Sequence, residues 1–299
     1  GVKTAAFSLE LVHGFSDGIS ERLQSLRPHP GQVAIAKVMR NILASSRLLR
    51  DRAAFQKMFE VNDDVHKIPA EVQEVYSLRC VPQILGPVYD ILEKVSREVE
   101  VELNAVTDNP VIDWKSKKFL HGGNFHGDYI AAGIDQLKAS LIKLTMLSER
   151  RINFFLNRSI NKYFPPFMNL KKLGFNLGLQ GLQFVATSTT AQSQTFAFPH
   201  HIHSIPTNAD NQDVVSMGTD AALLAAKVIE NAYILLTIEL VTLAQAVDFL
   251  GEREKLSHSS KEMFDELRRI FPKVTDDRVI TGELESALDF LKKVSILDV

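Results

Sequence analysis

The chain has 299 residues, of which 45% are hydrophobic and 23% are charged, and its formal net charge is -2. This composition is ordinary for a globular protein and gives no reason to expect nucleic acid or an anionic membrane as a partner. Because Cys80 is the only cysteine, an internal disulfide and a cysteine-based zinc site are excluded, and we expect a cytoplasmic location.

Helical signals dominate the chain from its start. Apolar residues at helical spacing predict one helix from Gln32 to Arg50, and an apolar stripe from Val88 to Val106 predicts another, with Pro87 in its first turn. The segment 108–110 (Asp-Asn-Pro) is expected to end that helix, because a residue before proline is pushed out of the helical region. Helices are expected over residues 2–15, 32–50, 87–106, 128–161, 177–195, 212–250, 257–271 and 281–294, with a surface connection over 51–69.

Two further features complete the fold prediction. Residues 111–114 and 118–120 are expected to pair as a small hairpin. The helix over 212–250 is apolar around most of its surface and belongs inside a bundle, and no uncharged apolar run in it reaches the roughly 18 residues that a membrane span needs. We predict a single all-α domain over residues 1–299, a bundle of long, nearly antiparallel helices with a small β-hairpin near 111–120.

The stretch from Gln73 to Gln83 contains a phenol, a guanidinium and two primary amides but no apolar periodicity. If Tyr76 to Arg79 is a helical turn, the three-residue spacing puts both side chains on one face. There they could bind a small anion, since arginine holds a carboxylate through two parallel hydrogen bonds and tyrosine can donate a hydrogen bond or exchange a proton. The alternative is a structural arginine paired with a buried carboxylate, with Tyr76 packed against it.

Polar residues also gather in three other expected loops or helix ends, where functional side chains are common. These segments are residues 104–110, 122–127 and 208–218. Asp108, Asn109 and Asp210 are also ordinary helix-capping residues, so capping is the alternative for them. Asp213 and Glu239 could act as an acid or a base, with a helix cap or a buried ion pair as the alternative.

Three histidines, His200, His201 and His203, suggest a metal site, because imidazole is a common ligand. Against this, no carboxylate or cysteine lies nearby at a spacing typical of zinc enzymes, and adjacent residues point apart in an extended chain. We therefore expect no metal and place the three in a polar surface or interface loop. The sequence contains no Gly-x-Ser-x-Gly, Gly-x-Gly-x-x-Gly or Walker motif.

The chain carries five segments in order: Tyr76–Gln83, Asn104–Pro110, Gly122–Gly127, Leu147–Ile152 and Asn211–Met217. Together they resemble the C-terminal part of the aromatic amino acid ammonia-lyase family, which includes the histidine, phenylalanine and tyrosine ammonia-lyases and related aminomutases. Residues Arg27–Gln32 also resemble the family's Arg-Pro-His-x-Gly-Gln segment. The resemblance extends over nearly the whole chain.

The resemblance implies catalytic roles for three side chains. Tyr76 would hydrogen-bond near the family's electrophilic cofactor and help to stabilise charge there, and Phe125 would pack against cofactor and substrate. Gln212 occupies the position at which histidine ammonia-lyases carry Glu and the phenylalanine and tyrosine enzymes carry Gln. A neutral amide is a poor partner for an imidazole but tolerates an arene edge, so the resemblance favours Phe or Tyr as the substrate.

The same resemblance assigns three residues to substrate binding. Arg79 would hold the substrate carboxylate, Gln73 would orient polar groups around cofactor and substrate, and Asn109 would join them. The implied reaction is the non-oxidative elimination of ammonia from an aromatic L-amino acid to give an aryl-acrylate. The alternatives left open are an aromatic amino acid 2,3-aminomutase, a histidine ammonia-lyase, and a non-catalytic helical assembly fragment.

The family's electrophile is 4-methylideneimidazole-5-one (MIO), formed from an internal Ala-Ser-Gly, and no Ala-Ser-Gly occurs in these residues. We therefore expect the chain to be the C-terminal part of a longer ammonia-lyase-like polypeptide, without the N-terminal MIO-bearing region. On its own the 299-residue chain is predicted to be inactive. By the resemblance, its partners are an MIO-bearing segment or subunit and further copies of the chain, in a homotetramer whose active sites are shared among subunits.

Overall fold

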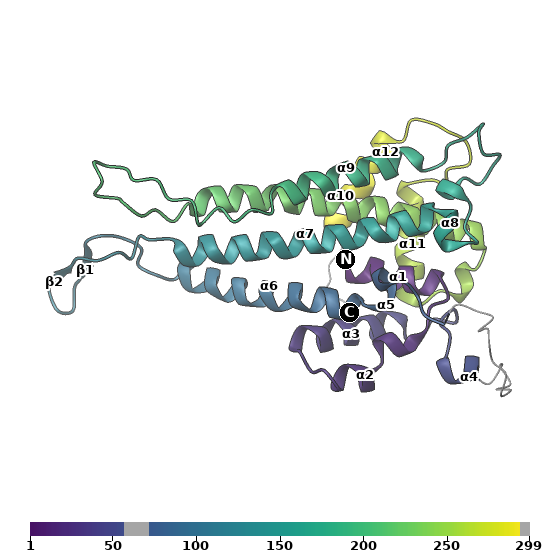
Figure 1. Ribbon diagram of the computed structural model, residues 1–299, viewed down its shortest axis with the longest axis horizontal. Helices are drawn as coiled ribbons and strands as arrows, with labels where there is room; N and C mark the ends of the chain where they lie inside the picture. The colour runs from purple at the N-terminus through teal and green to yellow at the C-terminus, as the bar shows by residue number, and fades with distance from the viewer. Residues whose placement is uncertain (57–71, 294–299) are drawn as a thin grey trace.

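The fold is taken from a computed structural model of the chain, which describes residues 1–56 and 72–293. These residues are mostly helical with one small antiparallel sheet, so the all-α prediction with a hairpin near 111–120 is confirmed (Figure 1). The elements are α1 (Val2–Leu11), α2 (Glu21–Ser25), α3 (Pro30–Leu43), α4 (Arg52–Gln56), α5 (Tyr76–Arg79), α6 (Val81–Leu103), β1 (Val111–Asp113), β2 (Lys118–Leu120), α7 (Asp128–Leu156), α8 (Arg158–Asn161), α9 (Gln180–Thr195), α10 (Gly218–Leu250), α11 (His258–Ile270) and α12 (Thr281–Lys293).

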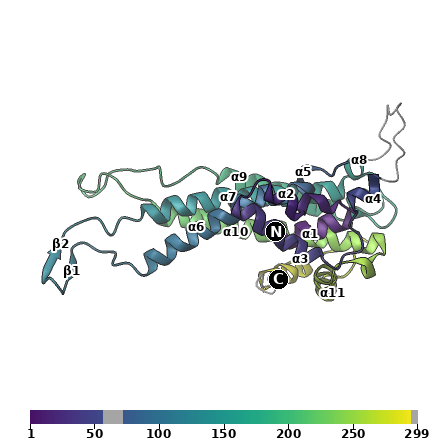
Figure 2. The ribbon, with the colours of Figure 1, turned by 90° about the horizontal axis from the view of Figure 1, so that it is seen from below.

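Four long helices, α6, α7, α9 and α10, run lengthwise beside one another and form the body of the molecule (Figures 1 and 2). Of these, α7 packs against each of the other three. The shorter helices α1, α3 and α5 gather around the N-terminal end of α6, while α11 and α12 pack against α10. In the hairpin, Val111 lies opposite Leu120 and Asp113 opposite Lys118.

The crossing of α3 and α6 depends on two glycines. A Cβ added to Gly31 would lie 2.2 Å from the carbonyl oxygen of Gly86, and one added to Gly86 would lie 2.6 Å from the backbone nitrogen of Gln32. Real Cβ atoms do not approach so closely, so any side chain at either position would force the helices apart. This crossing holds α3 against the end of α6 that adjoins α5.

The centre of the bundle holds an ion pair between Arg151 on α7 and Glu239 on α10, whose side chains are each 1% exposed. Arg151 donates from Nε at 2.5 Å and from Nη2 at 3.1 Å. The hydroxyls of Ser148 and Thr4 donate to the same carboxylate at 2.6 and 3.1 Å. Glu239 is therefore a buried structural partner, which was one of the alternatives for it, and not a free acid or base.

By length and composition α10 could cross a membrane, but 72% of its most apolar 18-residue window is buried inside the structure. Most of its apolar surface is packed against other helices, chiefly α7 and α9, although Leu223, Ile229 and Phe249 are exposed. The helix is therefore the core helix that the sequence predicted for this region.

Two predicted limits of α6 are wrong. The helix begins at Val81, and Pro82 occupies the first turn while Pro87 lies inside the helix. Proline is favoured in the first turn because its missing N–H has no partner there, and here Pro82 takes that place. The helix ends at Leu103, before the segment 108–110, although the apolar stripe continues to Val106, which is 64% exposed. Val106 is thus an exposed apolar residue outside the core, and its place in the apolar stripe does not show that it is helical.

Other limits differ by a few residues. The helix predicted to reach Arg50 ends at Leu43, where the chain turns toward α4. The surface connection predicted over 51–69 contains α4, and its part from 57 onward lies outside the described residues, as does Val294. The helix predicted from residue 212 begins at Gly218, because residues 207–212 form a turn.

Two long loops extend beyond one end of the bundle, at the left of Figure 1. One joins α6 to α7 and contains β1 and β2, and the other joins α9 to α10. The turn α5 lies at the opposite end of α6 in both views (Figures 1 and 2). The side chains proposed from the sequence are therefore divided between two places.

Candidate active site

The single turn of α5 presents Tyr76 and Arg79 together, as their spacing predicted. Leu78 between them is 1% exposed and anchors the turn in the core, whereas Tyr76 is 68% exposed. The guanidinium carbon of Arg79 lies 4.7 Å from the centre of the Tyr76 ring, within cation–π distance. Gln73 is exposed in the bend just before this turn. We call Gln73, Tyr76 and Arg79 the arginine group.

Among the described residues, Arg79 has no carboxylate partner. Its Nε donates to the backbone carbonyl of Glu74 at 2.8 Å. The Glu74 carboxylate is engaged elsewhere, since it accepts from the Phe15 N–H at 3.0 Å and from Arg50 Nη2 at 3.3 Å. The structural ion pair considered for Arg79 is thus not observed in this part of the chain. Its two terminal nitrogens retain the geometry that binds a carboxylate through parallel hydrogen bonds.

The loop between α6 and α7 carries Asn109 and Phe125. The Asn109 side-chain oxygen accepts from the Gly122 N–H at 3.0 Å and closes the loop at the base of the hairpin. Asp108 accepts from the N–H of Asn109 itself at 2.7 Å, so neither residue is a helix cap. Phe125 is 55% exposed, and its ring is thus accessible to a ligand or to another chain.

The loop between α9 and α10 carries Gln212 at its tip. Thr207 and Gln212 exchange two backbone hydrogen bonds of 3.0 and 3.2 Å, and the Thr207 hydroxyl donates to the Gln212 amide oxygen at 3.0 Å. Between them Asn208, Ala209 and Asp210 have φ of 53, 52 and 62°. Asp210 therefore forms part of a left-handed turn rather than a helix cap. The role of Thr207 was missed, although the Asn-Ala-Asp that follows it is a turn signal.

These two loops meet beside the start of α7. His126 Nε2 lies 3.2 Å from the carbonyl oxygen of Val214, and its Nδ1 lies 2.8 Å from Asp128. A Cβ added to Gly127 would lie 3.3 Å from the Ser216 hydroxyl. Asn109, Phe125 and Gln212 thus stand at one end of the bundle, and we call these three the loop group.

One chain does not bring the arginine group and the loop group together. The 23 residues of α6 separate them, and at 1.5 Å per residue this helix is about 35 Å long. Arg79 lies just before its first residue, and Asn109 follows its last. A single small ligand could contact both groups only if they came from different copies of the chain.

The histidines of the α9–α10 loop have other contacts. The His203 ring stacks on Phe198, with centres 5.2 Å apart and planes at 18°. His201 Nδ1 lies 2.8 Å from Asp135 on α7. Within residues 1–56 and 72–293, no group of three His, Cys, Asp or Glu side chains is placed to hold a metal ion. Asp213, considered as an acid or base, is exposed beside Gln212.

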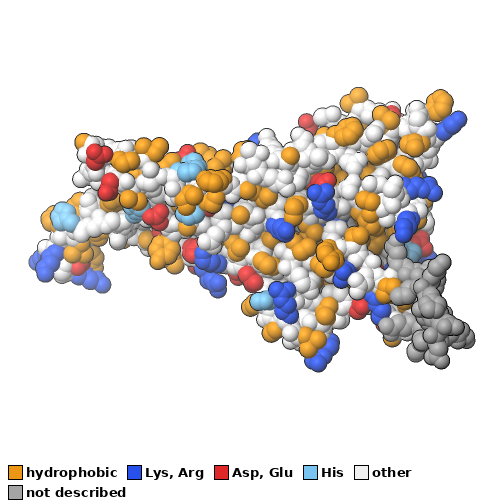
Figure 3. Space-filling view, in the orientation of Figure 1, with side chains coloured by type: hydrophobic (Ala, Val, Ile, Leu, Met, Phe, Trp, Pro, Cys, Tyr) orange, Lys and Arg blue, Asp and Glu red, His pale blue; other side chains and the backbone are white. Residues whose placement is uncertain are grey.

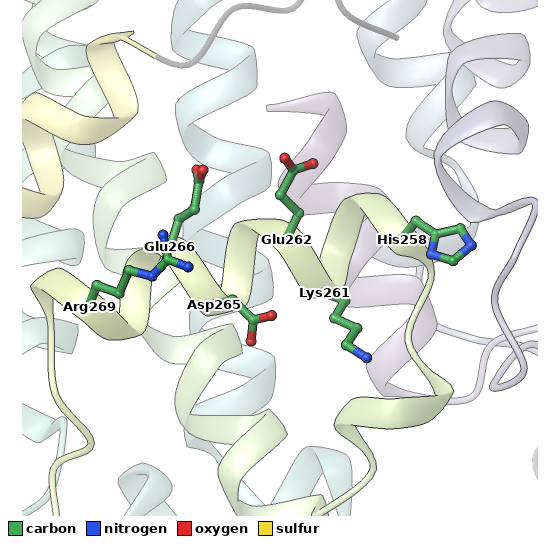
Figure 4. A pocket seen from close by; sticks show the side chains of 6 residues that line it. All are labelled: His258, Lys261, Glu262, Asp265, Glu266 and Arg269. Atoms are coloured by element: carbon green, nitrogen blue, oxygen red, sulfur yellow. The ribbon is translucent and has the colours of Figure 1, made fainter.

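A pocket of about 310 Å³ lies on a different part of the surface (Figure 4). Its lining comes from the charged face of α11 alone: His258, Lys261, Glu262, Asp265, Glu266 and Arg269. In the close-up, Glu262 and Glu266 point to one side of the helix and Lys261 and Asp265 to the other. A hollow bounded by one exposed helix face is not shaped to enclose a ligand. No residue of the arginine group or the loop group lines it.

Comparison with known proteins gives a consistent family. Residues 2–269 match the model of the family described as aromatic amino acid lyase. The chain is 37% identical over 294 residues to histidine ammonia-lyase 1 of Fusobacterium nucleatum, and 34% identical over 299 residues to the tyrosine ammonia-lyase of Cupriavidus metallidurans. These alignments cover 98 and 99% of the chain and 54 and 56% of the two relatives.

A third relative links sequence and structure. The MIO-dependent tyrosine 2,3-aminomutase of Streptomyces globisporus is 36% identical over 297 residues, which are 98% of the chain and 55% of that protein. The crystal structure of the tyrosine aminomutase from the same organism superimposes with a TM-score of 0.93 over 98% of the chain, at 35% identity, and covers 56% of that structure. The chain therefore spans about half the length of the relatives it matches.

Proposed function

Because the chain belongs to the aromatic amino acid lyase family, we propose that it supplies the carboxylate-binding and ring-binding side chains of an enzyme that eliminates ammonia from an aromatic L-amino acid. The observation that carries this proposal is the state of Arg79. Its Nε is held by a backbone carbonyl, its face lies on the Tyr76 ring, and its terminal nitrogens have no carboxylate partner in the described chain. An arginine so held is preorganised for a substrate carboxylate.

In the proposed reaction the substrate Cβ–H and Cα–N bonds break and a Cα–Cβ double bond forms, giving an aryl-acrylate, ammonia and the proton. Arg79 binds the carboxylate and fixes the substrate against Tyr76. The Tyr76 hydroxyl, exposed beside the guanidinium, donates a hydrogen bond where charge develops. Gln73 and Asn109 complete the polar contacts, and Phe125 covers the substrate with its exposed ring.

The electrophile is proposed to be an MIO group, the cofactor for which the Streptomyces globisporus relative is named. The 299 residues contain no Ala-Ser-Gly, so they do not include the tripeptide that would form it. We propose that the group comes from a segment or subunit outside this sequence and that the 299-residue chain alone is inactive. The contribution of this chain is then to bind and orient the substrate.

Substrate preference rests on Gln212. The relatives include an enzyme named for histidine and two named for tyrosine, so similarity alone leaves the choice open. A neutral amide suits a phenyl or phenol ring better than an imidazole that needs a charged acceptor. We therefore favour Phe or Tyr, with histidine as the alternative substrate.

The division of the candidate residues supports shared sites in a homo-oligomer, which we propose to be a tetramer. If two copies pack antiparallel along their long helices, the arginine group of one lies beside the loop group of the other. Large exposed apolar side chains along the long helices suit such burial, and Figure 3 shows apolar side chains spread over this face of the bundle. They include Leu92, Val101 and Leu103 on α6, Phe184 and Val185 on α9, and Leu223 on α10, with exposed fractions of 45, 70, 80, 65, 45 and 65%.

We propose that the protein acts in the cytoplasm. The direct test is to express the polypeptide encoded by the complete reading frame and to incubate it with L-Phe, L-Tyr and L-His. Ammonia and aryl-acrylate in equal amounts support the lyase, whereas a β-amino acid without net ammonia supports the 2,3-aminomutase. Mass spectrometry of the same protein checks for the dehydrated Ala-Ser-Gly of the MIO group. A reading frame and neighbouring genes that encode no Ala-Ser-Gly, with no product from any substrate, would leave only the non-catalytic helical assembly.

A further inference from the structure

The α9–α10 loop is fastened to α7 through a buried carboxylate. Asp135 accepts from the backbone N–H groups of His200 at 2.7 Å and His201 at 2.8 Å, and from His201 Nδ1 at 2.8 Å. Lys138, one turn further along α7, donates to Asp135 at 2.6 Å and to the carbonyl oxygen of Phe198 at 3.0 Å. The Asp135 and Lys138 side chains are 2 and 0% exposed. Four hydrogen bonds thus join the outgoing limb of the loop to α7, and the bond between Lys138 and Asp135 links the two α7 side chains that make them.

The charge state of this cluster suits a permanent anchor. Burial alone would raise the pKa of the Asp135 carboxyl, but the hydrogen bonds from Lys138 and His201 outweigh it and lower the pKa to about 2. The carboxylate therefore stays ionised at neutral pH and accepts all of its partners. Hydrogen bonds to a charged group contribute more than neutral ones, especially where water is excluded.

The returning limb of the same loop is held at the two residues that precede α7. His126, immediately before the helix, contacts the Val214 carbonyl oxygen at 3.2 Å, and Ser216 packs against Gly127. From Gly127 to Asp135 is eight residues, or about 12 Å along a helix. The two ends of the loop are therefore attached a short distance apart, one at the start of α7 and the other two turns into it.

The two limbs are joined to each other as well. The Ser204 hydroxyl oxygen accepts from the Val215 N–H at 3.1 Å, and Thr207 and Gln212 close the tip. Because these bonds tie the two limbs together, we expect a shift of the outgoing limb at His201 to move the tip that carries Gln212. Phe125 lies three residues before the first residue of α7, so α7 helps to set the position of Gln212 relative to Phe125.

We propose that His201, with Asp135 and Lys138, positions Gln212 for contact with the ring of the aromatic amino acid. This inference rests on the proposed function, because it assigns the anchor to substrate recognition. Asp135 and His201 are positioning residues in this scheme and do not contact the substrate. The histidine-rich segment is thus assigned the role of holding one member of the loop group, Gln212, in place.

The test uses variants of His201 and not of Asp135, because removing the carboxylate would leave the buried Lys138 ammonium without a charged partner. His201→Leu removes the hydrogen bond from the His201 side chain to Asp135 and keeps the one from its backbone N–H. His201→Asn is the conservative variant, since an Asn side-chain nitrogen can take the place of the histidine Nδ1 as a donor. His203→Leu is the matched control, because His203 stacks on Phe198 and makes no bond to Asp135.

The first readout is hydrogen–deuterium exchange of the 299-residue chain, followed by mass spectrometry. We expect His201→Leu to speed exchange in the loop over 200–215 by at least about tenfold, the factor expected for a lost hydrogen bond to a charged group. His201→Asn and His203→Leu should exchange within about twofold of the unchanged chain, on the reasoning that neither loses that bond. Unchanged loop exchange in His201→Leu, or equal acceleration in both leucine variants, would overturn the anchor.

The second readout is the KM and kcat of the complete polypeptide for its aromatic substrate. We expect His201→Leu to raise KM about tenfold with kcat changed less than about twofold, because ring contacts stabilise the bound substrate and the transition state alike. His201→Asn should restore KM. Faster loop exchange with an unchanged KM would overturn the positioning role while leaving the anchor. If the complete polypeptide turns over no substrate, the proposed function fails, and the exchange result still decides the anchor.

Discussion

The guanidinium carbon of Arg79 lies 4.7 Å from the centre of the Tyr76 ring, while Arg79 Nε donates to the Glu74 carbonyl oxygen. One face and one edge of the guanidinium are thus used by the protein, and the terminal nitrogens remain for a ligand. Tyr76 is 68% exposed, so this pair is at the surface of the isolated chain. The preorganised arginine, rather than a closed pocket, is what one chain contributes to the proposed site.

Gln212→Glu should shift the substrate preference of the complete polypeptide toward histidine. A carboxylate accepts the imidazole N–H far better than an amide, whereas a phenyl ring gains nothing from the charge. We expect the ratio of kcat/KM for L-His to that for L-Phe to rise at least about tenfold, the effect of one charge-assisted hydrogen bond. Gln194→Glu on the exposed surface of α9 is the control, and an unchanged ratio in Gln212→Glu would remove Gln212 from ring recognition.

Gly86→Ala should destabilise the chain through the crossing of α3 and α6. The new Cβ would lie 2.6 Å from the backbone nitrogen of Gln32 and 2.8 Å from its Cα, and backbone cannot swing aside as a side chain can. We expect a loss of about 1–3 kcal/mol in the free energy of unfolding, measured by urea denaturation. Gly181→Ala in α9 has open space around its Cβ and should change stability by less than about 1 kcal/mol. Equal effects of the two substitutions would contradict the tight crossing.

Arg151 and Glu239 should behave as a coupled pair. Arg151→Met leaves a buried carboxylate, and Glu239→Gln leaves a buried guanidinium, so each single change should cost about 3–5 kcal/mol. The double variant leaves neither charge and should cost clearly less than the sum of the two. The free energies of unfolding of the four proteins give the coupling energy, and additive losses would argue against the ion pair.

The contribution of the buried Glu10 carboxyl to the free energy of unfolding should decrease as the pH rises. Burial raises the pKa of this carboxyl above its ordinary value of 4.5, although hydrogen bonds from Ser257 and other groups partly oppose the rise. The folded chain therefore holds the proton more tightly than the unfolded chain. This contribution to stability is complete below pH 4.5 and is lost as the pH rises through the raised pKa.

Glu10→Gln removes this titrating group and keeps an oxygen for the Ser257 N–H. The free energy of unfolding of the variant should therefore fall less between about pH 4.5 and 8 than that of the unchanged chain. Glu262→Gln, on the exposed face of α11, should leave the pH dependence as it was. A steeper fall in Glu10→Gln than in the unchanged chain would contradict the assigned direction.

Features that depend on neighbouring residues could be predicted from the sequence. The spacing of Tyr76 and Arg79 predicted that a helical turn there would place both side chains on one face, and α5 is such a turn. Apolar periodicity predicted the long helices of the bundle. The hairpin followed from two short apolar runs around a polar turn. Periodicity failed at Val106, because a stripe that is exposed in one chain still looks like the buried face of a helix.

Contacts between distant parts of the chain could not be predicted in this way. His201 and Asp135 are 66 residues apart, and Arg151 and Glu239 are 88 apart, and neither pair leaves a local pattern. The order of the five family-like segments in the sequence also does not show how far apart they lie in the folded chain. Only the structure reveals that the length of α6 stands between Arg79 and Gln212, so that the candidate residues form two groups.

The most direct test of the account is kcat/KM of the complete polypeptide with Arg79→Ala and Arg79→Lys, beside Arg97→Ala on the exposed face of α6 as the control. We expect Arg79→Ala to lower kcat/KM for L-Phe or L-Tyr by at least about a hundredfold, from the loss of a bidentate charge-assisted pair. Arg79→Lys should recover little of it, because an ammonium cannot bind a carboxylate through two parallel bonds. The free energy of unfolding should fall by no more than about 1–2 kcal/mol, from the lost hydrogen bond to the Glu74 carbonyl and the lost contact with the Tyr76 ring. Full activity in Arg79→Ala would contradict the assignment of Arg79 as the carboxylate-binding residue.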